Sequence, residues 1–593
     1  MISARARSLF ARAALTALVL TSSACSEWKA PAIPPGQPNP PPPMDRPRAS
    51  AGGSASTPAK AKTPREAFAA LRTRILYEWL QADPNKGREL GLHEFDGKIA
   101  DYSKAGIEKQ IERLSKTRTE LLAIDPAALG ENDALDHAIL KNQIDLHLFR
   151  QIDRAAWRKD PRYYEELFGV NAYLDRDYAP LEERAKRLLA HEKAALAQVK
   201  NVSENLTSPM SKAVVETAIK VYKGYVEYLK GDVARILKGV GDQAFQADFS
   251  ETNGTLAAEA QKIVDRLTKE ELPKADDSHV LGTDKYKKLL LVQEGLELPL
   301  ADFKAMGEKN LQENKKAYQA LQKKAKVTRP KATELLATAT KLMDASREFV
   351  VQKGLVTIPT TDKAVLKETP PFMRWNSAFL NGPGPFEKTA TTAFYYITTP
   401  DPTWPKKEQE EYIMPKGTLL STTVHEVYPG HFLQGQWERR APSTVQAMFG
   451  SYSFVEGWAH YAEQMMIEEG FGKEDPQNKL GQLSDALLRN CRYVVSIGIH
   501  TEGMTLDQAA KRFQTDCFQD KATAREQAVR GTFDPGYFAY TLGKIQILEL
   551  RETAKKKLGD RFSLKKFHDA LLAHGSPVVP LLRERVLAEL GAK

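Results

Sequence analysis

A histidine–glutamate pair followed by a second histidine is the part of this sequence best suited to chemistry. His425 and Glu426 are adjacent, His431 closes the heptapeptide HEVYPGH, and Glu456 lies further downstream. Two neutral imidazoles and one carboxylate can hold a zinc ion and leave a coordination position open for water. A neighbouring carboxylate can take a proton from that water. The set predicts a zinc-dependent hydrolase in which His425, His431 and Glu456 bind the metal and Glu426 is the general base.

The spacing of the two histidines requires a break in the helix. In the familiar H-E-x-x-H arrangement the histidines are four positions apart and share one helix face. Here they are six positions apart, which on an unbroken helix turns them about 240° away from each other. Pro429 removes a backbone donor and Gly430 tolerates unusual dihedrals. We therefore expect a kink that returns His431 to His425; without it, the segment is a helix end with two ordinary histidines.

A second motif, YSFVEGWAHYAE at residues 452–463, has the pattern of a helix. Glu456, His460 and Glu463 then lie on one face, where acidic groups among aromatic side chains need a partner such as a cation. Glu456 is the expected third ligand. For His460 and Glu463 the pattern favours support of the ligands from outside the metal shell, or ordinary polar contacts.

Three ordered motifs carry a family resemblance: HEVYPGHFLQ, then FVEGWAHYAE, then DPGYFAYTLG at residues 534–543. From about residue 64 to the C-terminus the chain resembles the bacterial family called domain of unknown function 885, which is grouped with the zincin-type metallopeptidases. The resemblance implies the same zinc ligands and the same base, in a largely helical enzyme related in plan to angiotensin-converting enzyme and similar gluzincins. The chain departs from the family pattern at Phe432, where a histidine is frequent, and at His460, where an aliphatic residue is common.

Tyr540 in the third motif is a candidate for stabilising the oxyanion that forms when water attacks a carbonyl. Tyr540 and Tyr537 resemble the paired tyrosines of gluzincins. They could equally be core aromatics at a helix start, because Asp534-Pro535 is a typical N-terminal helix signal. His500 is a further candidate for contact with the substrate or the oxyanion.

Substrate recognition has two candidate sources. Arg489, Arg492 and Arg530 could receive a carboxylate, as a carboxypeptidase requires, although structural ion pairs are favoured for at least two of them; Arg530 is the expected substrate contact. The segment 391–397 has strand composition. We expect Ala393, Phe394 and Tyr395 to form an edge strand that binds an extended peptide through its backbone, with a packing strand as the alternative.

The chain of 593 residues is expected to be mainly α-helical, with a gluzincin-like arrangement of helical halves around a groove and a small β-sheet beside the metal. Apolar residues recur every three or four positions in segments 64–84, 104–124, 132–152, 180–206 and 213–237. Loops with Pro and Gly dominate residues 350–420. We expect an N-terminal helical region over residues 64–350 and a catalytic region over residues 351–593.

The N-terminus predicts export. Residues 1–24 combine early arginines with a short apolar stretch, as in a secretory signal, and Cys25 resembles the lipidated cysteine of a bacterial lipoprotein. Simple cleavage after Ala24, giving a periplasmic product, is the alternative. Residues 25–63 are rich in Pro, Ala and Ser and should form a disordered tether. Cys491 and Cys517 could pair in an oxidising compartment or remain free thiols.

The net charge of +9 is spread over mixed helix faces without a basic patch among aromatics, so nucleic-acid binding is not expected. The preferred function is hydrolysis of a peptide bond by a Zn²⁺ enzyme in the cell envelope, held by a lipid anchor at the outer membrane. The alternatives are a zinc hydrolase of a non-peptide amide or ester, and a catalytically silent, tethered binding protein.

Overall fold

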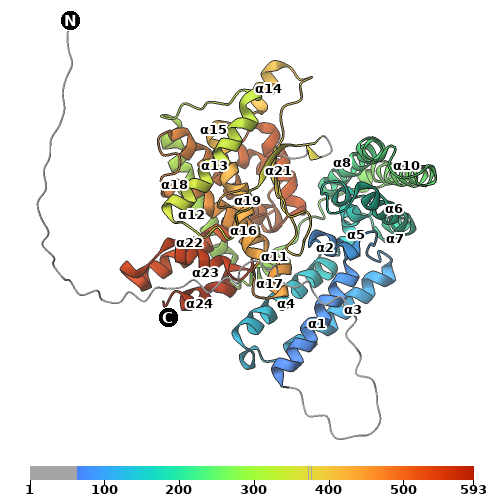
Figure 1. Ribbon diagram of the computed structural model, residues 1–593, viewed down its shortest axis with the longest axis horizontal. Coiled ribbons are helices and arrows are strands. Elements are labelled where there is room, and N and C mark those ends of the chain that lie inside the picture. Colours follow the sequence, from blue (N-terminus) through green and yellow to red (C-terminus); the bar gives the residue numbers. More distant parts are fainter. Residues whose placement is uncertain (1–62, 371–372, 375–376, 593) are drawn as a thin grey trace, which may run out of the picture. The chain divides into compact units, whose positions relative to one another are not determined.

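Helices make up most of the structure, and one small sheet accompanies them (Figure 1). The computed structural model describes residues 63–370, 373–374 and 377–592. The expected signal peptide, Cys25 and nearly all of the tether lie outside the described residues. The helices and the three-stranded sheet confirm the expected mainly helical fold with a small sheet. Among the described helices, none has both the length and the apolar character needed to cross a membrane.

The first helices follow the periodic segments of the sequence. Thr63 caps the first of them and forms a reciprocal capping box with Glu66, while Pro64 occupies the first helical position. These helices are α1 (Pro64–Ala82), α2 (Pro84–Glu89), α3 (Lys104–Leu122), α4 (Glu131–Leu148) and α5 (Ala156–Lys159). Local pattern and local structure agree for α1, α3 and α4, which each bury apolar residues that recur every three or four positions.

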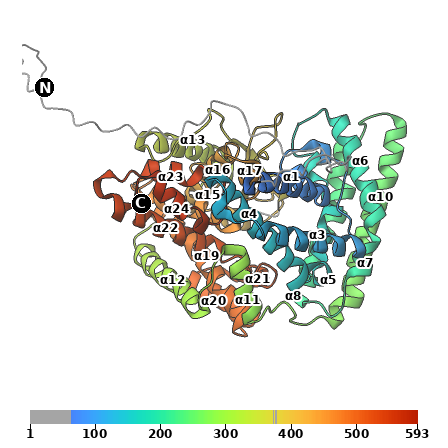
Figure 2. The same ribbon diagram turned by 90° about the horizontal axis from the view of Figure 1, so that it is seen from below.

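A second group of helices packs around its own apolar core. α10 lies along α6 and α8 in both views (Figures 1 and 2). Large buried residues of this core include Tyr164, Phe168 and Tyr222. The helices of the group are α6 (Leu181–Gln198), α7 (Lys200–Asn205), α8 (Lys212–Tyr228), α9 (Ala234–Leu237) and α10 (Gln243–Arg266).

The remaining helices surround α19, the longest helix of the described chain. They are α11 (Thr283–Glu294), α12 (Leu300–Gln322), α13 (Leu335–Lys353), α14 (Lys406–Tyr412), α15 (Lys416–Glu426), α16 (His431–Glu438), α17 (Thr444–Met448), α18 (Tyr452–Glu468), α19 (Pro476–Thr501), α20 (Leu506–Cys517), α21 (Lys521–Phe533), α22 (Ala539–Leu558), α23 (Leu564–Leu572) and α24 (Val579–Glu589). α12, α15 and α20 all pack against α19. One core joins residues on both sides of residue 350, including Tyr286, Phe303, Tyr493 and Leu542.

The sheet has three short strands in the order β1-β3-β2. β1 (Val365–Glu368) runs parallel to β3 (Phe394–Ile397), and β2 (Ala378–Asn381) runs antiparallel to it. The strand expected at residues 391–397 is therefore present, but its expected edge position is wrong. β3 is the central strand, so its backbone groups pair with both neighbours and are not free to bind a peptide. β2 is an edge strand.

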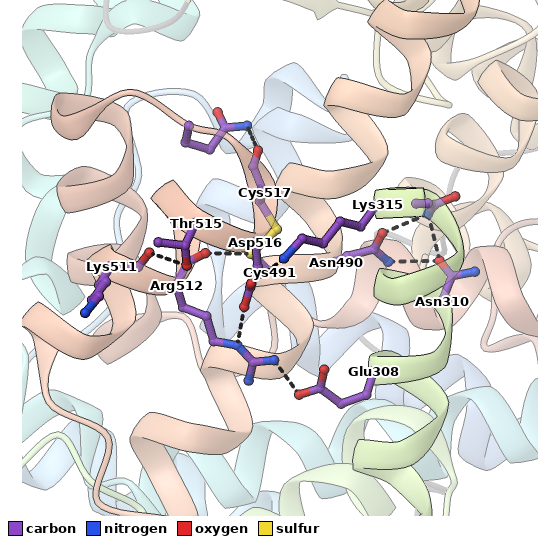
Figure 3. The surroundings of a disulfide bond; sticks show 12 residues. Glu308, Asn310, Lys315, Asn490, Cys491, Lys511, Arg512, Thr515, Asp516 and Cys517 are labelled. Carbon is purple, nitrogen blue, oxygen red and sulfur yellow. Dashed lines mark hydrogen bonds and ion pairs between the residues drawn. A yellow bond between two sulfur atoms is a disulfide. The ribbon is translucent and has the colours of Figure 1, made fainter. Parts of the chain in front are cut away.

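The two cysteines of the folded region form a disulfide, which decides between the paired and free alternatives. Cys491 on α19 is bonded to Cys517 at the end of α20, with the sulfurs 2.02 Å apart. Figure 3 shows the bond beneath a set of polar contacts that ties the same two helices to α12. One of these is the ion pair between Arg512 and Glu308, at 2.6 Å. Covalent and ionic links therefore hold α20 against α12 and α19.

Glu192 generates a prediction for the helical group around α10. It is fully buried in α6, and its two carboxylate oxygens have no hydrogen-bond partner among the described residues. Burial raises the pKa of Glu192 to about 8. Because the folded protein holds this proton more tightly than the unfolded chain, stability should fall as pH rises from the ordinary carboxylate range to about 8.

We expect Glu192→Gln, which stays neutral, to remove that loss and to raise Tm by roughly 5 °C at pH 9, with little effect at pH 4.5. Thermal unfolding followed by circular dichroism at both pH values measures this. Glu204→Gln, at an exposed position on α7, is the control. Equal Tm shifts at the two pH values would contradict the prediction.

Candidate metal centre

The helix that carries the first histidine ends immediately after the adjacent glutamate. α15 stops at Glu426, because Val427 leaves the helical region with φ −118° and ψ −83°, and Pro429 supplies no backbone donor. A new helix, α16, begins at His431. The expected break is therefore present, and it turns the second histidine back toward the first.

Gly430 makes this turn possible. A Cβ at this position would lie 1.8 Å from the carbonyl oxygen of His425, far inside van der Waals contact. The amide of Gly430 donates to the carbonyl of Val424 at 3.1 Å, and the Trp458 indole of α18 donates to the carbonyl of Pro429 at 2.8 Å. The turn is thus folded onto the end of α15 and fastened to α18.

Three potential ligand atoms meet at this point. The Nε2 atoms of His425 and His431 are 3.1 Å apart, and their rings are nearly perpendicular, with centroids at 4.6 Å. Glu456 Oε2, from the second turn of α18, lies 3.4 Å from the first Nε2 and 3.7 Å from the second. These are the three residues of the described chain that meet the geometric requirement for a shared ion.

The donor set fits zinc. Bonds of 2.0–2.1 Å to a tetrahedral ion place neighbouring ligand atoms about 3.3–3.4 Å apart, and the three measured separations bracket that value. Glu456 Oε2 is also buried without a hydrogen-bond partner among the described residues. A cation between the three atoms would provide the missing partner, and mixed imidazole and carboxylate ligation suits zinc.

The three potential ligands also shift one another's pKa values. Despite its burial and the neighbouring Arg489, interactions with Glu456 and Glu463 raise the pKa of His425 to about 10. Burial and the charge of His425 lower the pKa of His431 to about 4. Although burial opposes it, interaction with the two histidines lowers the pKa of Glu456 to about 2. These opposite shifts arise because the three side chains act on one another at close range.

Glu463 contacts the ligand His425 at Nδ1, the ring nitrogen that does not face the other two ligands. Its Oε1 lies 2.7 Å from His425 Nδ1, which makes Nδ1 the donor and leaves Nε2 free for a metal. Arg489 of α19 donates to the same carboxylate at 3.0 Å. His460 Nδ1 lies 3.2 Å from Glu463 Oε2, so His460 contacts the supporting carboxylate and is not one of the three grouped ligand atoms.

Glu426 lies beside the ligands and against the sheet. The backbone amide of Leu380 in β2 donates to Glu426 Oε2 at 2.9 Å. Burial raises the pKa of Glu426 to about 7, and the charge of His425 opposes this rise. A carboxyl group that titrates near neutrality can both accept a proton and return it.

Tyr540 lies near the ligand shell, in the first turn of α22. The guanidinium carbons of Arg489 and Arg492 lie 5.7 Å and 4.8 Å from the centre of its ring. The ring of Tyr452 packs against it edge-on at 5.5 Å, one turn before Glu456 on α18. Tyr540 thus lies among residues of α18 and α19 that adjoin the ligands.

Close glycine packing fixes that position. A Cβ on Gly543 would lie 1.8 Å from the carbonyl oxygen of Ser453, and a Cβ on Gly457 would lie 2.5 Å from the Cα of Gly543. α22 and α18 therefore touch backbone to backbone, one residue away from Glu456.

Two other predicted residues are not brought to the ligands. Tyr537 is fully buried, and its hydroxyl donates to the carbonyl of Gln527 at 3.5 Å. His500 is also fully buried, with Nε2 2.8 Å from the carbonyl of Gly531. Along α19 it lies about 16 Å beyond Arg489, and burial lowers its pKa to about 3. His500 is a core histidine of the described fold rather than part of this site.

The residues predicted for substrate contact are already engaged. Arg530 donates to Asp534 at 3.0 Å and to the Tyr452 hydroxyl at 2.9 Å. Ala393 and Tyr395 are fully buried, and the Tyr395 hydroxyl lies 3.3 Å from Thr423 Oγ1 of α15. Phe394 in β3 is partly buried between the side chains of Arg176 and Lys367. These contacts fit the alternative reading of a packing strand.

A cavity of about 210 Å³ opens beside the donors. It is lined by His431 and Phe432 of α16, by Leu380 of β2 and by the loop residues Gly382 and Thr391. Phe432, which stands where the resembled family often has a histidine, thus faces space next to a ligand.

Sequence reasoning missed several groups around the site. Leu380 acts through its backbone amide, for which no side-chain signal exists. Lys544 is buried and Asp485 is partly buried, both near Glu463: desolvation raises the pKa of Asp485 to about 6 and lowers the pKa of Lys544 to about 8. Their helical spacing, four residues before Arg489 and four after Tyr540, was the available signal.

Comparison with known proteins gives a family and a fold. The model of the family described as "Bacterial protein of unknown function (DUF885)" matches residues 84–586. No curated protein matches the chain.

Two solved structures are similar over most of the chain. One is described as "a putative lipoprotein of unknown function from Shewanella oneidensis"; it has a TM-score of 0.72 and 23% identity, over 88% of this chain and 99% of that one. The other is described as "the putative lipoprotein from Colwellia psychrerythraea", with a TM-score of 0.73 and 18% identity over 90% and 100%. At these identities the likeness establishes the fold alone.

The contact between Glu463 and His425 yields a prediction. Replacing Glu463 by Gln removes the charge that orients His425 Nδ1, so we expect zinc affinity to fall about 10–100-fold. Competition with a chromophoric chelator measures it. Glu468→Gln on the same helix, where the carboxylate pairs with Arg551 at 3.2 Å, is the control. Unchanged affinity in the Glu463 variant would show that this carboxylate does not support the ligand.

Proposed function

This chain belongs to the DUF885 family of bacterial proteins, and we propose that it is a zinc-dependent peptidase of the cell envelope. The observation that carries the proposal is the meeting of His425, His431 and Glu456 around one point, with Glu426 beside it. A protein that only binds a partner has no need for a base of this kind next to a ligand set. The family's zincin-type assignment and a gluzincin-like plan are part of the proposal.

His425 Nε2, His431 Nε2 and Glu456 Oε2 would hold the ion. Zinc bound there would lower the pKa of a water molecule and polarise the carbonyl of the substrate. Glu463 would keep His425 in the tautomer that presents Nε2. Arg489 in turn holds Glu463 in place, so the ligand geometry depends on α15, α18 and α19 together.

Glu426 would move the proton. As the water attacks, Glu426 accepts its proton; as the peptide bond breaks, the same carboxyl group returns the proton to the leaving amine. Burial raises the pKa of Glu426 above its ordinary value, and the charge of a bound zinc ion would act in the opposite direction and favour the ionised base. The amide of Leu380, which donates to Oε2, keeps the other oxygen free to face the water.

Tyr540 would stabilise the charge that develops on the carbonyl oxygen. A hydroxyl donor is the kind of group that lowers the energy of such an oxyanion. The guanidinium of Arg489 near its ring adds positive charge to this side of the site.

β2 would position an extended substrate. Its outer edge is unpaired within the sheet, and at Leu380 that edge faces Glu426. A peptide that adds to this edge by backbone hydrogen bonds would pass directly in front of the base. The cavity lined by Leu380 and His431 would receive a substrate side chain.

Two observations support the proposed location. The similar solved structures are each described as a "putative lipoprotein", and the N-terminal sequence has a signal-like stretch before Cys25. We propose that Cys25 carries a lipid that anchors the enzyme in the envelope, at the outer membrane.

Replacing Glu426 by Gln tests the proposal. We expect zinc to remain bound at one ion per chain, while kcat on any peptide that the zinc-loaded protein cleaves falls about 10²–10⁴-fold, because the base is lost. A library of peptides with free and blocked termini supplies the substrates. Glu438→Gln serves as control: Glu438 is a buried carboxyl group of the next helix that bonds to Gln434 and Ser576. Unchanged turnover in the Glu426 variant would refute the assigned base.

A further inference from the structure

Arg492 is a buried cation without an anionic partner. Its side chain is 8% exposed, and its Nε donates to the neutral Gln527 amide at 2.8 Å. In the described part of the chain, no carboxylate lies within 4.0 Å of its guanidinium. The two terminal nitrogens of the fork, which suit a carboxylate best, have no hydrogen-bond partner there.

The neighbouring arginines differ in this respect. Arg489, one turn earlier on α19, is held by Glu463. Arg530 of α21 is held by Asp534. Both are structural ion pairs, which leaves Arg492 as the arginine of the three that is available to a carboxylate from outside the chain.

The surroundings of Arg492 favour an anion. Burial and the charge of Arg530 lower the pKa of Arg492, because neighbouring positive charges repel each other. Leaving a buried cation unpaired is costly, and a bound carboxylate would remove that cost.

Tyr540 connects Arg492 to the reacting centre. The Arg492 guanidinium lies over its ring at 4.8 Å, and that ring also packs against Tyr452, one turn from the ligand Glu456. Arg492 lies about 4.5 Å along α19 beyond Arg489, which itself lies 3.3 Å from His425 Nδ1. The rise between the two arginines is close to the length that one extended residue spans, about 3.3–3.6 Å, so a receptor at Arg492 would lie one or two residues from the bond that is cut.

We propose that Arg492 receives the free C-terminal carboxylate of the substrate, so that the enzyme removes one or two residues from the C-terminus of peptides. This inference rests on the proposed peptidase function. It assigns the carboxylate to Arg492 instead of Arg530, because Arg530 already forms an ion pair with Asp534. It also makes the enzyme an exopeptidase, which does not cut within chains whose C-terminus is blocked.

The test compares each cleaved peptide of the library in two forms, with a free C-terminal carboxylate and with a C-terminal amide. For the zinc-loaded wild type we expect kcat/KM to be about 100-fold higher for the acid form. Arg492→Gln should lose about that factor on the acid form, mainly through KM, and should affect the amide form far less. Arg492→Lys, which keeps the charge but not the fork, should fall between the two.

Binding gives a readout that does not need turnover. Titration calorimetry of the zinc-loaded Glu426→Gln protein should show that the acid form binds and the amide form binds about 100-fold more weakly. Adding Arg492→Gln should abolish the difference. Arg551→Gln is the matched control: Arg551, on the far part of α22, is equally buried, at 8% exposure, but pairs with Glu468 of α18.

The outcomes separate the two proposals. Equal cleavage of acid and amide forms, with Arg492→Gln behaving like the wild type, would overturn the carboxylate receptor and leave the peptidase standing. Absence of any cleavage, together with acid-specific binding that depends on Arg492, would overturn the peptidase and keep the receptor. A loss in Arg551→Gln equal to that in Arg492→Gln would show that the effect is general destabilisation, and would overturn the receptor.

Discussion

Two imidazole nitrogens and a carboxylate oxygen meet within 3.7 Å where α15, α16 and α18 come together. Three close glycine contacts surround this point. Gly430 lets the turn after α15 close on the carbonyl of His425, Gly457 and Gly543 bring α22 against α18, and Gly417 meets Gly481 where α15 crosses α19. Each contact excludes a side chain of any size. Gly430 acts on the ligands directly, because it closes the turn between His425 and His431. The other two contacts seat α18 and α15, which carry Glu456 and His425, against α22 and α19.

The polar groups beneath the ligands follow from the same convergence. Bringing His425 into a buried position requires a partner for Nδ1, which Glu463 supplies, and Glu463 in turn requires Arg489. Asp485 of α19 and Lys544 of α22 interact with Glu463 and Arg489 and so belong to the same network. Glu426 remains outside it, held through the amide of Leu380. Burial raises the pKa of Glu426 to about 7. Although Glu463 is also buried, Arg489 and the neighbouring histidines keep it ionised.

Local sequence predicted what depends on local forces. The helices of residues 64–237, the helix of Glu456 and the break at Pro429-Gly430 were all predicted from periodicity and from the properties of proline and glycine, and the structure confirms them. The family resemblance agrees with the matched region. The convergence of His425, His431 and Glu456 was expected from residue types and is present as geometry; their role as zinc ligands stays a proposal.

Features that depend on contacts between residues far apart in the sequence were harder to predict. β3 is central because β1, a short and largely exposed strand, pairs with it, and exposure leaves no alternating pattern to recognise. His500 was a candidate from the sequence, but in the structure it lies about 16 Å beyond Arg489 along α19. Glu463, the partner of Arg489, lies on α18, whereas the partners of Arg492 and Arg530 lie on α21 and directly after it. The separate roles of the three arginines therefore could not be predicted from one segment.

The most direct measurement of the central claim is X-ray diffraction from crystals soaked in zinc, with data collected on both sides of the zinc absorption edge. The account predicts one anomalous peak, about 2.0–2.1 Å from His425 Nε2, His431 Nε2 and a carboxylate oxygen of Glu456. At saturating zinc, no peak at that point, or a peak elsewhere with these three side chains pointing apart, would contradict it.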